Sequence, residues 1–276
     1  MAQPIVGLIA GAGLLPILVA RGIRAAGHRV ACIGLGTQYD AALPSQCDQF
    51  ATAGVIRIGR WIRLLRRWGV RDAVMIGRVR KARMYEPTLW LRQLPDLRAG
   101  LLWYRILRHD RRDQTVLTAV ADELSRHGIE LIDSTHYISD HLADAGNLTH
   151  RRLSGAQQAD LDFGWPVLLK MVGLDVGQSI AVKDRDIIAV EAIEGTDAMI
   201  RRAGELCRSG GWMLLKGARP EKDMRFDVPT VGIQTIVNLK QAGVAALVLA
   251  AGKVILADKP RVLAAAEDAR ITVVGV

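Results

Sequence analysis

Three carboxylates lie close together in the second half of the chain, in the run Glu191-Ala-Ile-Glu194-Gly195-Thr196-Asp197. We expect this run to lead from the end of a strand into the start of a helix. Thr196 would then be the helix N-cap, and Asp197 would suit the first turn electrostatically. Alternatively, the carboxylates bind magnesium, which prefers hard oxygen ligands, or a hydroxyl of a substrate. The spacing alone leaves both interpretations open.

A loop that is dense in charge follows the apolar stretch 212–216. Its candidate residues are Lys216, Arg219, Pro220, Asp223, Arg225, Asp227 and Thr230. Most charged loops are solvated surface, but this one connects a buried strand to a helix that we expect over 230–242, with Thr230 as N-cap. Cations there could neutralise phosphate oxygens, and a carboxylate could hold a metal or orient water. The combination favours phosphoryl chemistry.

A glycine pair near the N-terminus, Gly11-Ala-Gly13, follows the apolar stretch 5–10. Glycines let a backbone approach a phosphate, and the next helix would offer free N–H groups. A tight strand-to-helix turn would need the same residues. The dinucleotide-binding fingerprint requires a third glycine, but this chain has Pro16 at that position. It also requires an acidic residue at the end of the second strand, where this chain has Ile33-Gly-Leu35. NAD is therefore disfavoured relative to another nucleotide.

The excess positive charge is concentrated in one segment. The 276-residue chain has a net charge of +9, and residues 57–112 alone hold 16 basic and 4 acidic residues. Such a surface attracts phosphates of nucleotides, lipids or nucleic acid. Residues 60–68 place Trp61, Leu64, Leu65 and Trp68 on one helical face. This predicts an ordinary helix packed on a sheet, or alternatively an interfacial membrane helix.

The elements that must position these residues belong to the α/β class. The opening strand, helix and strand predict a parallel sheet. We expect a Rossmann-like nucleotide-binding domain over 1–145 and a catalytic α/β domain over 146–276, because residues 134–165 are polar and rich in turn formers. Further predicted helices cover residues 97–107, 115–127, 196–206 and 260–269. A predicted hairpin joins strands 179–183 and 187–191, and further strands cover 246–250, 254–257 and 272–276.

The composition indicates a soluble cytoplasmic protein. No apolar run approaches the roughly 20 residues that span a bilayer, and the 3 cysteines, Cys32, Cys47 and Cys207, are too few for a disulfide framework. A peripheral contact with the cytoplasmic face of the inner membrane fits the basic segment.

These motifs together resemble one family, the UDP-2,3-diacylglucosamine diphosphatases that are not of the calcineurin-phosphoesterase type. The resemblance covers essentially the whole chain. It is carried by the opening run 7–16, by Asp175-Val-Gly-Gln178, by 190–202, and most specifically by Arg225-Phe-Asp227-Val-Pro-Thr230-Val-Gly. It implies a Rossmann-like first domain and a distinct second α/β domain, with the lipid held between them. It also implies magnesium dependence, a homodimer, and the products UMP and 2,3-diacylglucosamine 1-phosphate.

The resemblance also implies roles for single residues. Asp227 matches the family's key carboxylate, which we expect to bind magnesium or to position the attacking water. Lys216 and Arg225 would stabilise phosphate charge. The expected substrate-binding residues are Gly11, Gly13, Leu14, Gly77, Glu191, Glu194, Gly195, Thr196, Asp197, Pro220 and Thr230.

The chain departs from the family pattern in three places. Arg78 stands where an asparagine often follows the glycine, Arg112 and Gln114 stand in a usual Gly-Asp-Asp run, and Lys222 replaces a glutamine. The added charge could serve another nucleotide-linked or anionic lipid. A function of another class, nucleic-acid binding by segment 57–112, would leave the acid-rich second half without a role, so we expect no nucleic-acid partner.

Overall fold

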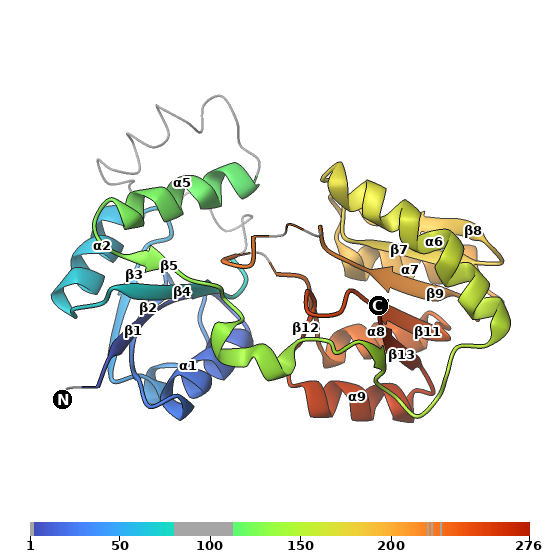
Figure 1. The fold of residues 1–276 in the computed structure, drawn as a ribbon, viewed down its shortest axis with the longest axis horizontal. Helices are drawn as coiled ribbons and strands as arrows, with labels where there is room; N and C mark the ends of the chain where they lie inside the picture. Colours follow the sequence, from blue (N-terminus) through green and yellow to red (C-terminus); the bar gives the residue numbers. More distant parts are fainter. Residues whose placement is uncertain (1–2, 80–112, 220, 222, 227) are drawn as a thin grey trace. The chain divides into compact units, whose positions relative to one another are not determined.

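The computed structural model describes residues 3–79, 113–219, 221, 223–226 and 228–276. The chain divides into two compact units. The first runs to Ile138 and includes Arg225 and Phe226, and the second comprises Ser139–Met224 and Val228–Val276. Each unit has its own sheet and core, which confirms the predicted α/β class with a parallel sheet in the first half (Figure 1).

The first unit contains a five-stranded parallel sheet in the order β3-β2-β1-β4-β5. Its elements are β1 (Ile5–Ala10), α1 (Leu15–Ala25), β2 (Arg29–Leu35), η1 (Pro44–Gln46), β3 (Gln49–Ala53), α2 (Ile58–Arg67), β4 (Asp72–Ile76), α5 (Asp113–Ser125) and β5 (Glu130–Leu131). The strand order reverses between β1 and β4. In doubly wound sheets, ligands bind at such a switch point, beside the carboxyl ends of the strands.

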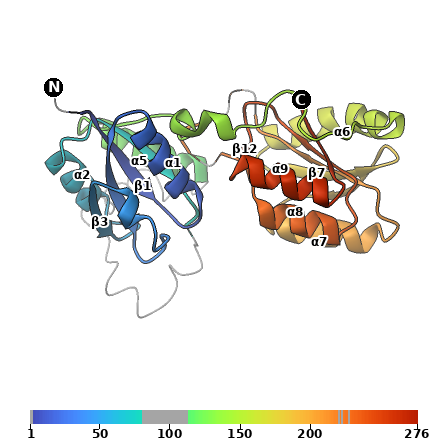
Figure 2. The ribbon, with the colours of Figure 1, turned by 90° about the horizontal axis from the view of Figure 1, so that it is seen from below.

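Helices cover both faces of this sheet. Figures 1 and 2 show α1 on one face and α2 and α5 on the other. The core under α2 joins Ile9 and Ile33 of the sheet to Trp61, Leu65 and Leu124. Apolar strands buried on both faces are typical of parallel sheets.

The second unit contains a six-stranded mixed sheet in the order β6-β13-β11-β9-β7-β8, and a separate pair, β10 with β12. The sheet strands are β6 (Gly146–Asn147), β7 (Ser179–Lys183), β8 (Asp186–Val190), β9 (Met213–Lys216), β11 (Ala246–Leu249) and β13 (Thr272–Gly275). The separate pair consists of β10 (Thr230–Val231) and β12 (Ile255–Leu256). The helical elements are α6 (Gly155–Gly173), α7 (Thr196–Leu206), α8 (Ile233–Gln241) and α9 (Lys259–Asp268), and the 3-10 segment η4 (His136–His141) precedes β6.

The strands of this sheet alternate their side chains between two cores. Leu214 and Leu247 pack on the side of α7, α8 and α9, whereas Met213, Leu215 and Val248 pack on the side of α6. Figure 2 shows these helices on opposite faces of the sheet. The predicted hairpin is confirmed, since β7 and β8 pair antiparallel around Asp184 and Arg185, which both have positive φ.

Several predicted bounds were wrong. The helix expected over 230–242 begins at Ile233, because Thr230 and Val231 instead pair as β10 with β12. The structure also contains β3, a short and partly exposed strand that the pattern did not reveal. The polar stretch 134–165 contains the start of α6, where Ser154 and Gln157 form a capping box.

Three further expectations concern one predicted helix, the cysteines and membrane-spanning helices. The helix predicted over 97–107 lies outside the described residues. Cys32, Cys47 and Cys207 are free thiols, and Cys32 is fully buried in β2. In the described part of the chain, no helix combines the length and apolar character that crossing a membrane requires.

Candidate functional site

The second unit gathers buried polar side chains at the carboxyl end of β9. Lys216 is the last residue of β9 and lies opposite Ser179, the first residue of the antiparallel strand β7. Glu191 directly follows β8, so it reaches the same edge of the sheet. The carboxyl ends of parallel strands are where α/β sheets place ligands, and three elements deliver polar groups there.

A chain of hydrogen bonds links these groups. Lys216 is 3% exposed, and its Nζ donates to Ser179 Oγ at 3.2 Å and to Thr196 Oγ1 at 2.9 Å. The Thr196 hydroxyl donates in turn to Glu191 Oε1 at 2.8 Å. A buried ammonium needs polar partners and a counter-charge. Two hydroxyls hold the ammonium of Lys216, and one of them connects it to a carboxylate.

One of the two carboxylate oxygens of Glu191 accepts no hydrogen bond from the described residues. The residue is 8% exposed, and its Oε2 is buried without a hydrogen-bond partner among the described residues. Its backbone is held in place, since Glu191 N donates to Ser179 O at 2.9 Å and the backbone of Gly177 packs so closely that a Cβ there would overlap the Glu191 carbonyl oxygen. Leaving a buried carboxylate oxygen unpaired is costly, so Glu191 Oε2 is suited to accept a bond from a ligand.

The predicted N-caps at Thr196 and Thr230 were wrong. Gly195 caps α7 with φ +80, and Thr196 is the first helical residue, whose hydroxyl joins Lys216 and Glu191 instead. Gly232 caps α8, and the Thr230 hydroxyl donates to Val228 O. Glycine tolerates positive φ without strain, which lets the chain turn sharply from Glu194 into α7.

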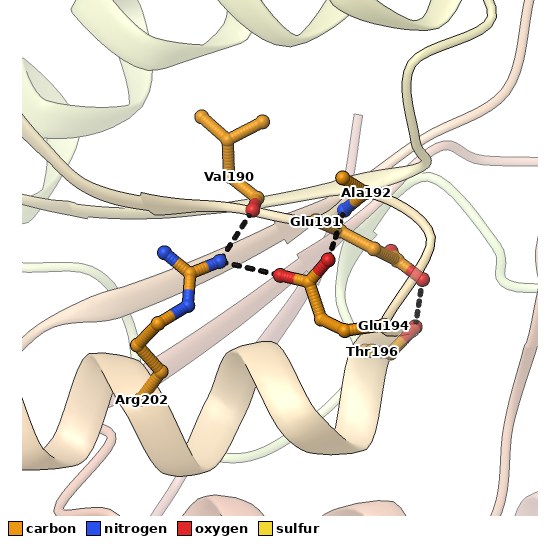
Figure 3. A network of polar contacts seen from close by, with 6 residues as sticks. All are labelled: Val190, Glu191, Ala192, Glu194, Thr196 and Arg202. Carbon is orange, nitrogen blue, oxygen red and sulfur yellow. Dashed lines mark hydrogen bonds and ion pairs between the residues drawn. The ribbon is translucent and has the colours of Figure 1, made fainter.

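The other two acids of the run bind protein groups. Glu194 pairs with Arg202, which also donates to Val190 O, and accepts a bond from Ala192 N at 3.2 Å (Figure 3). Its own backbone N–H, then Arg202, and last the backbone N–H of Ala192 hold the pKa of Glu194 below its ordinary value. Asp197 lies in the first turn of α7, as predicted, and accepts a bond from Asn238 of α8 at 2.9 Å. The structure therefore brings only Glu191 and Thr196 of this run together with Lys216.

The charged loop after β9 is described only in part. Pro220, Lys222 and Asp227 lie outside the described residues. Arg219 pairs with Asp175 at 3.1 Å and donates to Val172 O, which anchors the start of the loop.

The end of the same loop belongs to the first unit. Phe226 is 3% exposed in the core of that unit, and the guanidinium of Arg225 lies 5.5 Å from the centroid of its ring. The most specific motif of the chain therefore contains an apolar anchor as well as charged groups.

The predicted glycine site of the first unit lies at the switch point of its sheet. Gly11 follows β1 and Gly77 follows β4, and Ala12 exchanges two backbone hydrogen bonds with Arg78, at 2.8 and 2.9 Å. A Cβ on Gly11 would lie 2.8 Å from Gly77 C, and a Cβ on Gly77 would lie equally close to Gly11 C. Mutual backbone packing therefore accounts for both glycines without a ligand.

Gly13 and Leu14 differ from this pair. Gly13 has φ +105, and a Cβ there would meet open space. Leu14 is the N-cap residue of α1 and is 40% exposed. Gly13 thus keeps the feature that suggested phosphate approach, a glycine turn beside a helix N-terminus.

The tryptophan-rich helix α2 packs on the sheet of the first unit. Trp61 is 3% exposed, and its indole N–H donates to Gly54 O at 3.0 Å, while Ile62 and Leu65 are also buried. Leu64 and Trp68, the other two residues of the predicted apolar face, are half-buried against the same core, so the structure supports the ordinary packed helix over the interfacial alternative. Arg78, one of the departures from the family pattern, has an exposed side chain. Arg112 and the side chain of Gln114 lie outside the described residues.

Sequence reasoning missed Ser179, Arg202 and Asn238. Ser179 was predicted only as the start of a strand. Its place beside Lys216 depends on the pairing of β7 with β9, which no local pattern reveals. No group of three or more His, Cys, Asp or Glu suited to a metal occurs among the described residues.

Comparison with known families gives two matches that together span nearly the whole chain. The model of the LpxI N-terminal domain matches residues 5–141, and that of the LpxI C-terminal domain matches residues 144–274. A Caulobacter vibrioides protein named UDP-2,3-diacylglucosamine pyrophosphatase LpxI is 31% identical over 284 aligned positions, which cover 98% of this chain and 96% of that protein.

Two solved structures resemble the chain only weakly. A nucleoside-diphosphate-sugar epimerase from Pseudomonas aeruginosa aligns with 25% identity and a TM-score of 0.24, over 27% of this chain and 24% of its own. A biotin carboxylase from Campylobacter jejuni aligns with 12% identity and a TM-score of 0.28, over 74% of this chain and 42% of its own. At such scores the likeness carries no argument about fold or ligand.

Proposed function

This chain belongs to the LpxI family, and from that premise we propose that it hydrolyses the diphosphate of UDP-2,3-diacylglucosamine in lipid A synthesis. The products are UMP and 2,3-diacylglucosamine 1-phosphate. The observation that carries the proposal is the match over both domains, together with 31% identity over 98% of the chain. A match to one domain alone would support a nucleotide-binding fold without the reaction.

The polar edge of the second unit supports this chemistry. Hydrolysis of a diphosphate builds negative charge on the phosphoryl oxygens, and a cation in a site shielded from water stabilises that charge. Lys216 is such a cation, because its ammonium is buried and fixed by the hydroxyls of Ser179 and Thr196. We assign Lys216 the role of stabilising phosphate charge, and Thr196 and Ser179 the role of positioning it.

Water is the nucleophile, and we propose that it attacks the phosphorus on the sugar side. The bond from that phosphorus to the bridging oxygen breaks, and UMP leaves with the bridging oxygen. Asp227 is our candidate for the group that positions this water or binds the metal, and Arg225 for a second cation. Both assignments come from the motif that resembles the family.

Magnesium is the cofactor that we propose. Magnesium sites commonly use one or two carboxylates, with waters and substrate phosphate as the other ligands, so they do not need three protein carboxylates. Glu191 Oε2 fits such a ligand, because it is a buried oxygen without a partner in the described structure. Glu191 Oε2 is equally suited to accept a hydrogen bond from a hydroxyl of the substrate. When bound, the ion would neutralise phosphate charge.

The physical nature of the substrate suggests two further properties. An acylated sugar nucleotide is an amphiphile that partitions into membranes, so we propose that the protein works as a peripheral protein on the cytoplasmic face of the inner membrane. We also propose a homodimer, which the family resemblance suggests. Light scattering of the purified protein would test the dimer independently of activity.

The decisive experiment measures UMP release from UDP-2,3-diacylglucosamine. We expect release with magnesium, loss with EDTA, and recovery when magnesium is restored. Asp227→Ala should abolish release, whereas Asp268→Ala, which removes an exposed aspartate at the end of α9, should not. Absence of UMP from folded wild-type protein would contradict the substrate assignment.

A further inference from the structure

Helix α2 carries a dense row of arginines on its outer face. The stretch 57–71 contains six arginines and no aspartate or glutamate. Four of them, Arg60, Arg63, Arg66 and Arg67, lie on the helix itself and are exposed. At 100° per residue they fall within an arc of about 120°. We call these four residues the arginine face.

The opposite side of α2 fixes the orientation of this face. Ile58, Trp61, Ile62 and Leu65 are buried against the sheet of the first unit. The helix therefore cannot turn its apolar side outward, and the arginines point away from the core. A ligand of the arginine face must be recognised by charge, without insertion of the helix into an apolar phase.

The charge of the arginine face is not neutralised by the described structure. None of its four members has an ion pair among the described residues. Arg60 and Arg63 donate through Nε to the carbonyl oxygens of Thr52 and Gly59, at 3.1 and 3.3 Å, and these bonds leave the positive charge unpaired. Exposed cations that repel one another over one helix face weaken the fold slightly, so they need a reason outside it.

We propose that the arginine face is a docking surface for the anionic phospholipids of the membrane that holds the substrate. The inference rests on the proposed function, because a lipid substrate requires the enzyme to reach a bilayer. Each arginine near an anionic leaflet contributes about 1 kcal/mol of attraction, which decays within a Debye length of about 8 Å at physiological salt. Arginine also pairs bidentately with phosphate.

The test is sedimentation of the purified full chain with vesicles of 30% phosphatidylglycerol and 70% phosphatidylcholine. The test variant is R63Q/R66Q/R67Q, because glutamine keeps a high helix propensity. We expect wild-type protein to bind these vesicles and not pure phosphatidylcholine, and to dissociate as NaCl rises. Removing three arginines at about 1 kcal/mol each should weaken binding roughly a hundredfold.

A matched control removes the same charge elsewhere. R201Q/R208Q/K240Q changes three exposed cations of the second unit. It should bind vesicles within a few-fold of wild type, and melting temperatures should show that both triple variants are folded. Equal loss of binding in the two triple variants would reduce the effect to net charge and overturn the docking surface.

Other outcomes separate this inference from the proposed function. Wild-type protein that releases UMP but ignores anionic vesicles would overturn the docking surface and leave the reaction standing. Vesicle binding without UMP release would overturn the proposed reaction and leave the docking surface standing. A labelled oligonucleotide is the competing probe: if the R63Q/R66Q/R67Q variant loses oligonucleotide binding and keeps vesicle binding, the face is a nucleic-acid surface and the proposal is wrong.

Discussion

The two units place different chemistry at the carboxyl ends of their parallel strands. Beyond β1 and β4 of the first unit, the backbones of Gly11 and Gly77 pack directly against each other. At the end of β9 in the second unit, Lys216 is held by two hydroxyls, and the hydroxyl of Thr196 connects it to Glu191. Both regions were predicted to contain site residues: Gly11, Glu191 and Lys216 from residue type and position, and Gly77 from the family resemblance. A glycine beside a strand end can be explained by backbone packing alone, whereas a buried charge in the same position is not explained by packing.

The reason lies in the free energy of each arrangement. Two glycines in backbone contact leave no polar group unsatisfied, because Ala12 and Arg78 exchange their backbone hydrogen bonds. Burial of an ammonium raises the free energy of the folded state, and so does a buried carboxylate oxygen such as Glu191 Oε2, which has no hydrogen-bond partner among the described residues. Such groups at a strand end indicate a ligand. We therefore expect substitutions in the second unit to affect activity, and those of the glycine pair to affect stability.

The largest effect should come from Lys216→Met, which keeps the length of the side chain and removes its charge. Removing one preorganised donor from a site that stabilises developing charge costs about 10²–10³ in kcat. We expect a loss of this size in UMP release, with the protein still folded because methionine suits a buried position. Lys183→Met is the control, because Lys183 is half-buried at the opposite end of β7, where its Nζ donates to Ser209 Oγ and Gly210 O. If Lys216→Met kept wild-type activity, the buried charge at the end of β9 would have no more role in the reaction than the glycine pair of the first unit.

The next largest effect should be on stability, from Gly77→Ala. Gly77 has φ +103, and the new Cβ would lie 2.8 Å from Gly11 C, so both backbone strain and overlap oppose it. We expect a loss of about 3 kcal/mol in the free energy of unfolding, measured by urea denaturation. Activity per folded molecule should persist.

Gly69→Ala is the matched control for that glycine. Gly69 has φ +75 in the same unit, but its Cβ would meet open space. It should cost only about 1 kcal/mol, because strain alone remains. If Gly77→Ala were as mild as Gly69→Ala but inactive, the glycine pair would be a ligand site after all.

The sequence predicted the fold class and most elements, but the site only in part. Apolar periodicity located most of the described helices and strands to within a few residues, since burial follows directly from residue type, but it did not locate β3 or α6. Thr196 was misassigned because an N-cap and a bridging hydroxyl use the same residue type, and only the neighbouring Gly195 decides between them. Ser179 was missed because its partner Lys216 lies 37 positions away, on a strand whose pairing is set by the whole sheet.

A moderate effect should follow from Thr196→Val, which tests whether the link between Lys216 and Glu191 matters. Valine keeps the shape of threonine but removes the hydroxyl, so Lys216 loses one of its partners and Glu191 Oε1 loses its donor. We expect kcat to fall about thirtyfold, equivalent to about 2 kcal/mol. KM should change less, because positioning acts mainly on the transition state.

Thr196→Ser is the test of that mechanism. Serine restores the hydroxyl without the methyl group, so kcat should recover to within a few-fold of wild type. If serine failed to rescue while both variants melted like wild type, restoring the hydroxyl would not restore kcat, and the hydrogen-bonded link would carry no function.

The smallest effect should come from Glu194→Gln, the acid that the structure pairs within the protein. Its pKa is lowered in the folded state by backbone N–H groups and by Arg202. A lowered pKa means that the carboxylate stabilises the fold above its ordinary pKa, near 4.5, and that this contribution is lost as the pH falls through the folded value. Wild type should therefore melt slightly above Glu194→Gln at pH 7, and the difference should shrink below pH 4.5.

The comparison with Glu205→Gln shows whether this small effect is specific. Glu205 is exposed on the same helix and has no ion pair among the described residues, so its replacement should leave no pH-dependent difference from wild type. UMP release should be nearly unchanged in both variants, because Glu194 already binds Arg202 and Ala192 N. A large loss of activity in Glu194→Gln alone would add Glu194 to the site formed by Glu191 and Lys216. The ion pair with Arg202 would then position a residue that acts on the substrate.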